Sequence, residues 1–141
     1  MKFNSKKSRS HLSVLIILNI FFIGIFFFDL ISNSIQLING LIYFTFIFFL
    51  TIIIWGFFNT SYYIENKYFK YKSGPFYGKI EVSRINTIVK NKTLWSGYKM
   101  ATATKGLIVK FDNYKEIYIS PKSNELFIKE ILKLNDKIKI V

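Results

Sequence analysis

The chain has 141 residues, of which 51% are hydrophobic and 19% aromatic, and its net charge is +12. It contains no cysteine, which excludes disulfides, thiol nucleophiles, thiolate metal ligands and a lipid-modified cysteine. The longest apolar runs lie before residue 59, so the composition predicts a membrane segment followed by one small domain.

Two long apolar segments come first along the chain. The segment 12–32 carries Asp29 as its only charged residue, and the segment 37–58 carries none. At about 1.5 Å per residue, a helix of either length covers the roughly 30 Å hydrocarbon core of a bilayer. We therefore predict a transmembrane hairpin over 12–58. Asp29 lies close to the turn, which favours a place in the headgroup layer over a role in ion transport.

The basic residues before the first segment also resemble the start of a cleaved signal peptide. However, the first alanine in the chain is Ala101, so no cleavage site of the A-x-A type can follow, and an uncleaved anchor is favoured. Only the loop SNSIQ, residues 32–36, separates the segments, which places both chain ends on one side. Because basic residues precede the first segment and none lies in the loop, we expect a cytoplasmic basic N-terminus, 1–11, and a cytoplasmic domain, 60–141.

The part after the membrane segment alternates apolar and polar residues, as half-buried strands do. The predicted strands are a hairpin over 68–82, then 85–91, 105–111 and 116–119, all joined by short connections. After Pro121 the apolar spacing becomes helical, with Phe127, Ile128 and Ile131 on one face and Ser123 as the expected N-cap. The pattern predicts an α+β fold in which one C-terminal amphipathic helix covers an antiparallel sheet of about five strands.

Several stretches carry a resemblance to a known family. These are YFKYKSGPFYGKI at 68–80, KGLIVKF at 105–111 and, above all, IYISPKSNELFIKEIL at 117–132. They resemble the YyaB-like bacterial pleckstrin-homology (PH) domains, over about residues 62–135. The resemblance implies a PH-like β-barrel or sandwich capped by its C-terminal helix, in a bacterial cell membrane, and two N-terminal spans are common in such proteins. It does not imply phosphoinositide binding, because fold does not carry function.

Residues suited to catalysis are scarce. The only histidine is His11, and the carboxylates are spread over strands, a turn and the helix without metal-ligand spacing. We expect no enzyme, cofactor or metal site. Asp112 and Glu116 flank one hairpin turn, and turn chemistry accounts for Asp112. Nucleic acid is not an expected partner, because the chain has no Lys- or Arg-rich recognition helix.

Binding is the expected role, with membrane lipids as first partners. Four lysines on or near the predicted hairpin are candidates for contact with anionic headgroups, namely Lys67, Lys70, Lys72 and Lys79. A solvated face explains these lysines equally well. Trp95 and Tyr98 lie beside a predicted turn and are candidates for a loop that enters the membrane interface or holds a partner; packing over the end of the barrel is the alternative and is favoured for Trp95.

A membrane or cytoplasmic protein is the other possible partner. Some members of the resembled family are regarded as immunity proteins, so the resemblance leaves open an alternative function. In that alternative, the protein protects a membrane against a peptide toxin through protein–protein contacts. The sequence offers no specific motif for oligomer formation.

Overall fold

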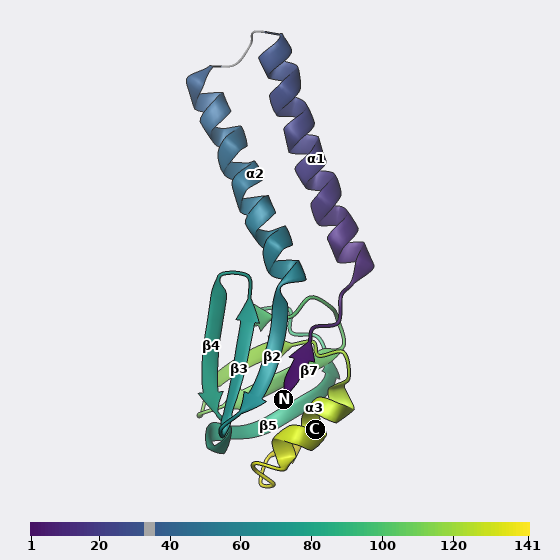
Figure 1. The fold of residues 1–141 in the computed structure, drawn as a ribbon, viewed down its shortest axis with the longest axis vertical. Coiled ribbons are helices and arrows are strands. Elements are labelled where there is room, and N and C mark those ends of the chain that lie inside the picture. Colours follow the sequence, from purple (N-terminus) through teal and green to yellow (C-terminus); the bar gives the residue numbers. More distant parts are fainter. Residues whose placement is uncertain (33–35) are drawn as a thin grey trace.

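Two long helices extend from one end of a β domain (Figure 1). The computed structural model describes residues 1–32 and 36–141, so the predicted loop at 32–36 lies largely outside the described residues. Helices α1 (Arg9–Ile31) and α2 (Leu37–Phe58) pack side by side as the predicted hairpin. Tyr43 of α2 donates a 2.8 Å hydrogen bond to Asp29, a partner that the sequence pattern did not predict.

Four antiparallel strands form the first sheet in the order β1-β2-β3-β4. They are β1 (Lys2–Asn4), β2 (Thr60–Glu65), β3 (Tyr68–Ser73) and β4 (Phe76–Glu81). The structure confirms the predicted β3–β4 hairpin. Its turn contains Gly74 at φ +55°, a left-handed conformation that glycine adopts without steric cost.

Strand β1 belongs to the domain although it precedes both apolar helices. The sequence pattern predicts only a separate basic segment over residues 1–11. In the structure, Lys2 pairs with Tyr63 and Asn4 with Ser61. The side chain of Phe3 is 6% exposed, and its ring meets that of Phe127 edge to face at 5.3 Å. The helical pair is therefore an insertion between the first two strands of one domain.

Five strands form the second sheet, in the order β6-β8-β7-β5-β9. They are β5 (Ile85–Lys92), β6 (Tyr98–Met100), β7 (Gly106–Phe111), β8 (Lys115–Ile119) and β9 (Lys139–Ile140), and a short 3-10 turn, η1 (Val82–Arg84), precedes β5. The central strands β5, β7 and β8 are antiparallel, as predicted. The short edge strands β6 and β9 pair in parallel with β8 and β5, which alternation alone did not predict.

Helix α3 (Asn124–Leu132) lies beside the sheets, in the part of the domain away from α1 and α2. As predicted, Ser123 caps it by accepting a 3.2 Å hydrogen bond from the Leu126 backbone N–H. Its face of Phe127, Ile128 and Ile131 is buried in the main core. A second, smaller cluster contains Val89, Ile108 and Tyr118 on β5, β7 and β8, and Leu94 and Ala101 pack against it.

The helices join the domain through short, bonded connections. Only Asn59 separates α2 from β2, and the Thr60 hydroxyl donates a 2.6 Å hydrogen bond to the carbonyl of Gly56. The Lys7 ammonium donates to the carbonyl of Phe57 at the end of α2. A Cβ atom on Gly74 would lie 2.9 Å from the Cα of Gly56, so the β3–β4 turn touches α2 directly. These contacts fix the direction of the helices relative to the sheets.

Candidate functional site

A cleft of about 360 Å³ lies where the helices meet the domain. One wall comes from α1 and α2 and includes Leu15 and Ile53. The other comes from the loops on either side of β6, namely Thr93–Trp95 and Ala101–Thr104, together with Tyr118. His11 and Lys99 are the basic residues along it. The cleft joins an apolar helical surface to a more polar domain surface, which is the chemistry that an amphipathic ligand requires.

Trp95 stands at the edge of this cleft, and its side chain is 85% exposed. Hydrogen bonds hold the main chain around it. The Lys99 ammonium donates to the Trp95 carbonyl at 2.6 Å, and the Lys105 backbone N–H donates to the Thr93 hydroxyl at 3.1 Å. Leu94 packs inward against the second apolar cluster. The loop therefore presents an indole outward from a fixed backbone.

Buried hydroxyl groups beside the cleft tie the N-terminal segment to the domain. Ser5 Oγ lies 2.7 Å from Thr102 Oγ1, 3.0 Å from Ser120 Oγ and 3.1 Å from the hydroxyl of Tyr62. Tyr62 in turn donates to the carbonyl of Met100, and burial raises the pKa of its hydroxyl. The cluster shares its hydrogen bonds internally, so these polar groups are buried without leaving a donor or acceptor unpaired. We call it the hydroxyl cluster.

The ISPK segment, the most specific part of the family resemblance, lies against the N-terminal residues. The Lys6 backbone N–H donates to the Ser120 carbonyl at 2.7 Å, and that of Lys122 donates to the Asn4 carbonyl at 3.0 Å. Ser5 and Pro121 form an isolated antiparallel bridge. The structural role of ISPK is thus to receive the segment that leads into α1, a role that could not be found without the position of β1.

The four candidate lysines do not gather at the cleft. Lys70 and Lys79 face each other across β3 and β4, in a row that also holds Lys2 and Tyr63, while Lys72 lies one row closer to the helices. Lys67 lies in the β2–β3 turn, at the far end of the sheet from the helices.

Local contacts occupy two of these lysines. Lys70 forms a 2.9 Å ion pair with Glu65, whose pKa is lowered by that hydrogen bond, and Lys79 lies over the ring of Tyr68 at 5.2 Å. Lys70, Lys72 and Lys79 share one face of the first sheet, as the strand register shows. Their contact with headgroups stays a prediction.

The two candidate aromatic residues are also separated. Trp95 lines the cleft, whereas Tyr98 meets the ring of Tyr71 edge to face at 6.0 Å. Tyr98 is therefore linked to the first sheet and does not share the surface of Trp95.

Comparison with known proteins places this geometry in a family. Residues 60–135, more than half of the chain, match the family described as Bacterial PH domain. The chain belongs to the bacterial PH domain family. It is also 27% identical over 88 residues to the "Uncharacterized protein YyaB" of Bacillus subtilis (strain 168). That likeness covers 62% of this chain and 60% of the relative, so the chain spans less than two thirds of the relative's length. No solved structure matches the chain significantly.

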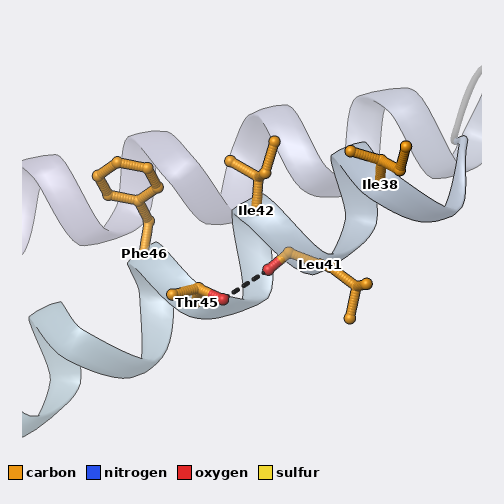
Figure 2. Close-up of a pocket in the computed structure, with 5 residues that line it drawn as sticks. All are labelled: Ile38, Leu41, Ile42, Thr45 and Phe46. Carbon is orange, nitrogen blue, oxygen red and sulfur yellow. Dashed lines mark hydrogen bonds between the residues drawn. The ribbon is translucent and has the colours of Figure 1, made fainter.

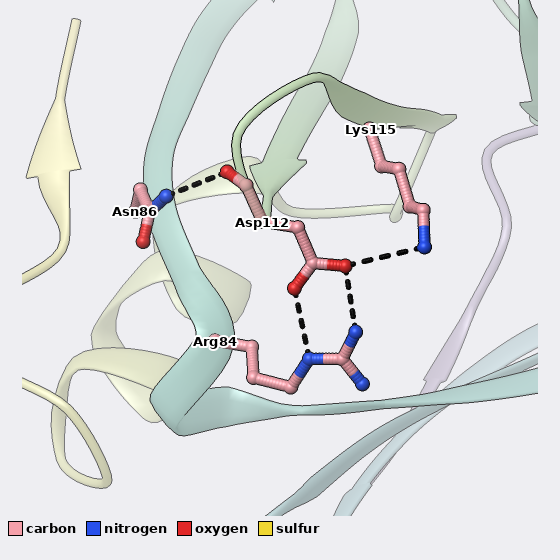
Figure 3. A network of polar contacts seen from close by, with 4 residues as sticks. All are labelled: Arg84, Asn86, Asp112 and Lys115. Atoms are coloured by element: carbon pink, nitrogen blue, oxygen red, sulfur yellow. Dashed lines mark hydrogen bonds and ion pairs between the residues drawn. The ribbon is translucent and has the colours of Figure 1, made fainter.

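An ion-pair network lies elsewhere on the PH domain, at the β7–β8 turn (Figure 3). Both carboxylate oxygens of Asp112 accept from the Arg84 guanidinium, at 2.9 and 2.6 Å, and Lys115 lies 3.4 Å away. The Asn86 side chain donates to the Asp112 carbonyl. The hydrogen bond from Arg84 lowers the pKa of Asp112 and raises that of Arg84. Since Asp112 has φ +53°, the network holds a strained turn, and Glu116 pairs instead with Lys110 at 3.9 Å.

An apolar groove of about 300 Å³ lies along α2, near the end of the hairpin away from the PH domain (Figure 2). Its lining residues are Ile38, Leu41, Ile42, Thr45 and Phe46. The one hydroxyl, on Thr45, donates to the Leu41 carbonyl of the same helix at 2.7 Å. The groove therefore offers no free polar group and resembles an ordinary lipid-facing helix surface.

Groups for metal-dependent chemistry do not converge. Within residues 1–32 and 36–141, no three His, Asp or Glu side chains lie close enough together to hold a metal ion.

Proposed function

We propose that the protein is a non-enzymatic, membrane-anchored binding module, and that the end of its PH domain next to α1 and α2 contacts phospholipid at the cytoplasmic face of the membrane. Helices α1 and α2 are long and apolar enough to cross a bilayer, and no residue in the most apolar stretch of either helix is buried in the protein. A core helix of a soluble protein would be mostly buried, so exposure of this kind supports insertion into lipid.

The position of β1 supports a permanent anchor. Cleavage after α1, as in a signal peptide, would remove Phe3 from the core and Ser5 from the hydroxyl cluster. Since β1 pairs with β2, the chain must return to the same side after α2. The basic residues before α1 favour the cytoplasm as that side.

One observation carries the lipid assignment, namely that the cleft extends along the apolar helices. Leu15 is six residues inside the start of α1 and Ile53 five residues from the end of α2, or about 9 and 8 Å along the axes. Trp95 lines the same cleft. An exposed indole in a cleft that begins at the helix ends would lie near the headgroups, where tryptophan is enriched in membrane proteins.

Depth-dependent quenching tests this function in the full chain. Trp55→Phe leaves Trp95 as the only tryptophan, and the protein is reconstituted in vesicles that contain lipids brominated at different acyl positions. We expect Trp95 to be quenched best by the shallowest bromines. The reciprocal Trp95→Phe protein, which keeps Trp55 near the end of α2, provides the control for an indole in the bilayer. Emission typical of fully hydrated indole, without quenching at any depth, would contradict the proposal.

A further inference from the structure

A basic pocket of about 260 Å³ lies next to the cleft, and the two share Thr104. Three lysines from separate segments line it: Lys6 between β1 and α1, Lys105 before β7, and Lys122 between β8 and α3. The first turn of α3 completes the wall.

The three lysines carry unneutralised charge. Five other basic residues of the PH domain form ion pairs, namely Lys70, Arg84, Lys110, Lys115 and Lys133. In the described part of the chain, the side chains of Lys6, Lys105 and Lys122 form none. Glu125 is the one carboxylate in the lining, so three positive charges and one negative leave +2. The N-terminus of α3 adds partial positive charge.

The main chain beneath these lysines is held in place. Asn124 donates from its side chain to the Lys105 carbonyl at 3.1 Å, and backbone bonds fix Lys6 and Lys122 to the ISPK segment and to β1. Lys105 has φ +56°, and a Cβ on Gly106 would lie only 2.1 Å from the Ile119 carbonyl oxygen. This packing brings separate segments together before any ligand arrives, which reduces the ordering cost of binding.

We propose that this pocket binds the phosphate of a net-anionic phospholipid whose acyl chain lies in the neighbouring cleft. Several ammonium donors around one small pocket match the several oxygens of a phosphate group. The adjacency at Thr104 joins a site for the headgroup to a site for the chain. The identity of the ligand as a lipid rests on the proposed function, whereas the phosphate chemistry rests on the lysines alone.

The test uses the full chain with Trp55→Phe in phosphatidylcholine vesicles that contain a small fraction of brominated lipid. The fraction is either brominated phosphatidylglycerol or brominated phosphatidylcholine, and quenching of Trp95 is compared between them. Each basic residue near an anionic lipid favours it about fivefold, so we expect a preference for phosphatidylglycerol of at least about tenfold. Lys6→Gln, Lys105→Gln and Lys122→Gln together should abolish it. The matched control, Lys129→Gln, Lys137→Gln and Lys139→Gln, removes the same charge from exposed lysines outside both pockets and should keep it.

The other outcomes separate the alternatives. Equal quenching by both lipids would overturn the phosphate pocket and leave the proposed function intact, whereas no quenching by either would overturn the proposed function. Equal loss in the two triple variants would assign the preference to net charge and overturn the pocket. A soluble source is tested by ³¹P line broadening of inorganic phosphate added to the protein in phosphatidylcholine nanodiscs. Broadening that depends on Lys6, Lys105 and Lys122, without a preference for phosphatidylglycerol, would overturn the lipid as ligand.

Discussion

Replacing Phe3 by alanine tests whether the residues before α1 are part of the PH domain. The side chain is 6% exposed and packs on the ring of Phe127 in the main core. Burial of this kind makes Phe→Ala changes cost about 3–5 kcal/mol. Because β1 is a three-residue edge strand that can shift to reduce the cavity, we expect the lower end, about 3 kcal/mol. A small domain has only about 5–15 kcal/mol in total.

Amide hydrogen exchange of the full chain in micelles measures this cost. Because β7 is a central, buried strand, we expect its amides from Leu107 to Val109 to exchange through global opening of the domain, and 3 kcal/mol then corresponds to about a hundredfold faster exchange. Phe76→Ala is the matched control, since Phe76 is 59% exposed on an edge strand of the same sheet. A change of less than about threefold for Phe3→Ala would show that β1 does not stabilise the domain and would refute its place in the fold.

Three further changes probe the contacts around the site and the distant turn. Thr102→Val removes a hydroxyl from the hydroxyl cluster and leaves its neighbours unpaired, so urea denaturation should show a loss of about 1–3 kcal/mol. The lowered pKa of Asp112 means that its pairing with Arg84 stabilises the fold above the ordinary carboxyl range and is lost as pH falls through the folded pKa. Asp112→Asn should therefore lower the melting temperature at neutral pH and flatten its decline in acid. Gly106→Ala should weaken the β7–β8 pairing, seen as faster amide exchange in both strands, whereas Gly24→Ala, with open space around it, should not.

The elements that the sequence predicts are those specified by local patterns. The β3–β4 hairpin follows from alternation on both sides of a Gly-Pro turn, and α3 from a change to helical spacing after a capping Ser123. Strand β1 has neither signal, because three residues cannot establish a period and its partner β2 lies more than fifty residues later. Pairing over such a distance depends on the hairpin of α1 and α2, which returns the chain to its starting point.

The candidate site could be predicted only in part, because it too depends on contacts between residues that are far apart in sequence. The turn beside Trp95 left both an exposed loop and packing over the barrel end open; the side chain is 85% exposed in the structure, and its contact with a membrane or a partner stays a prediction. The grouping of three lysines in one pocket could not be predicted, because Lys6, Lys105 and Lys122 meet only through tertiary contacts with the ISPK segment. Closeness in sequence is also misleading, because Lys67 is only three residues from Lys70 but lies in the β2–β3 turn, outside strand β3.

The two short connections, from β1 into α1 and from α2 into β2, decide which lysines could reach a membrane. A PH domain on a long flexible tether could turn any face toward the bilayer. Here, Asn59 alone links α2 to β2, and the linker into α1 is held by Ser5, Lys6 and Ser8 through hydrogen bonds to the domain. With α1 and α2 inserted in a bilayer as proposed, the sheets stand away from it on a fixed axis, and the influence of a lysine depends on its height along that axis. Because salt screens charges that are more than about 10 Å apart, Lys72 should affect lipid contact more than Lys70 or Lys79, and Lys67 least.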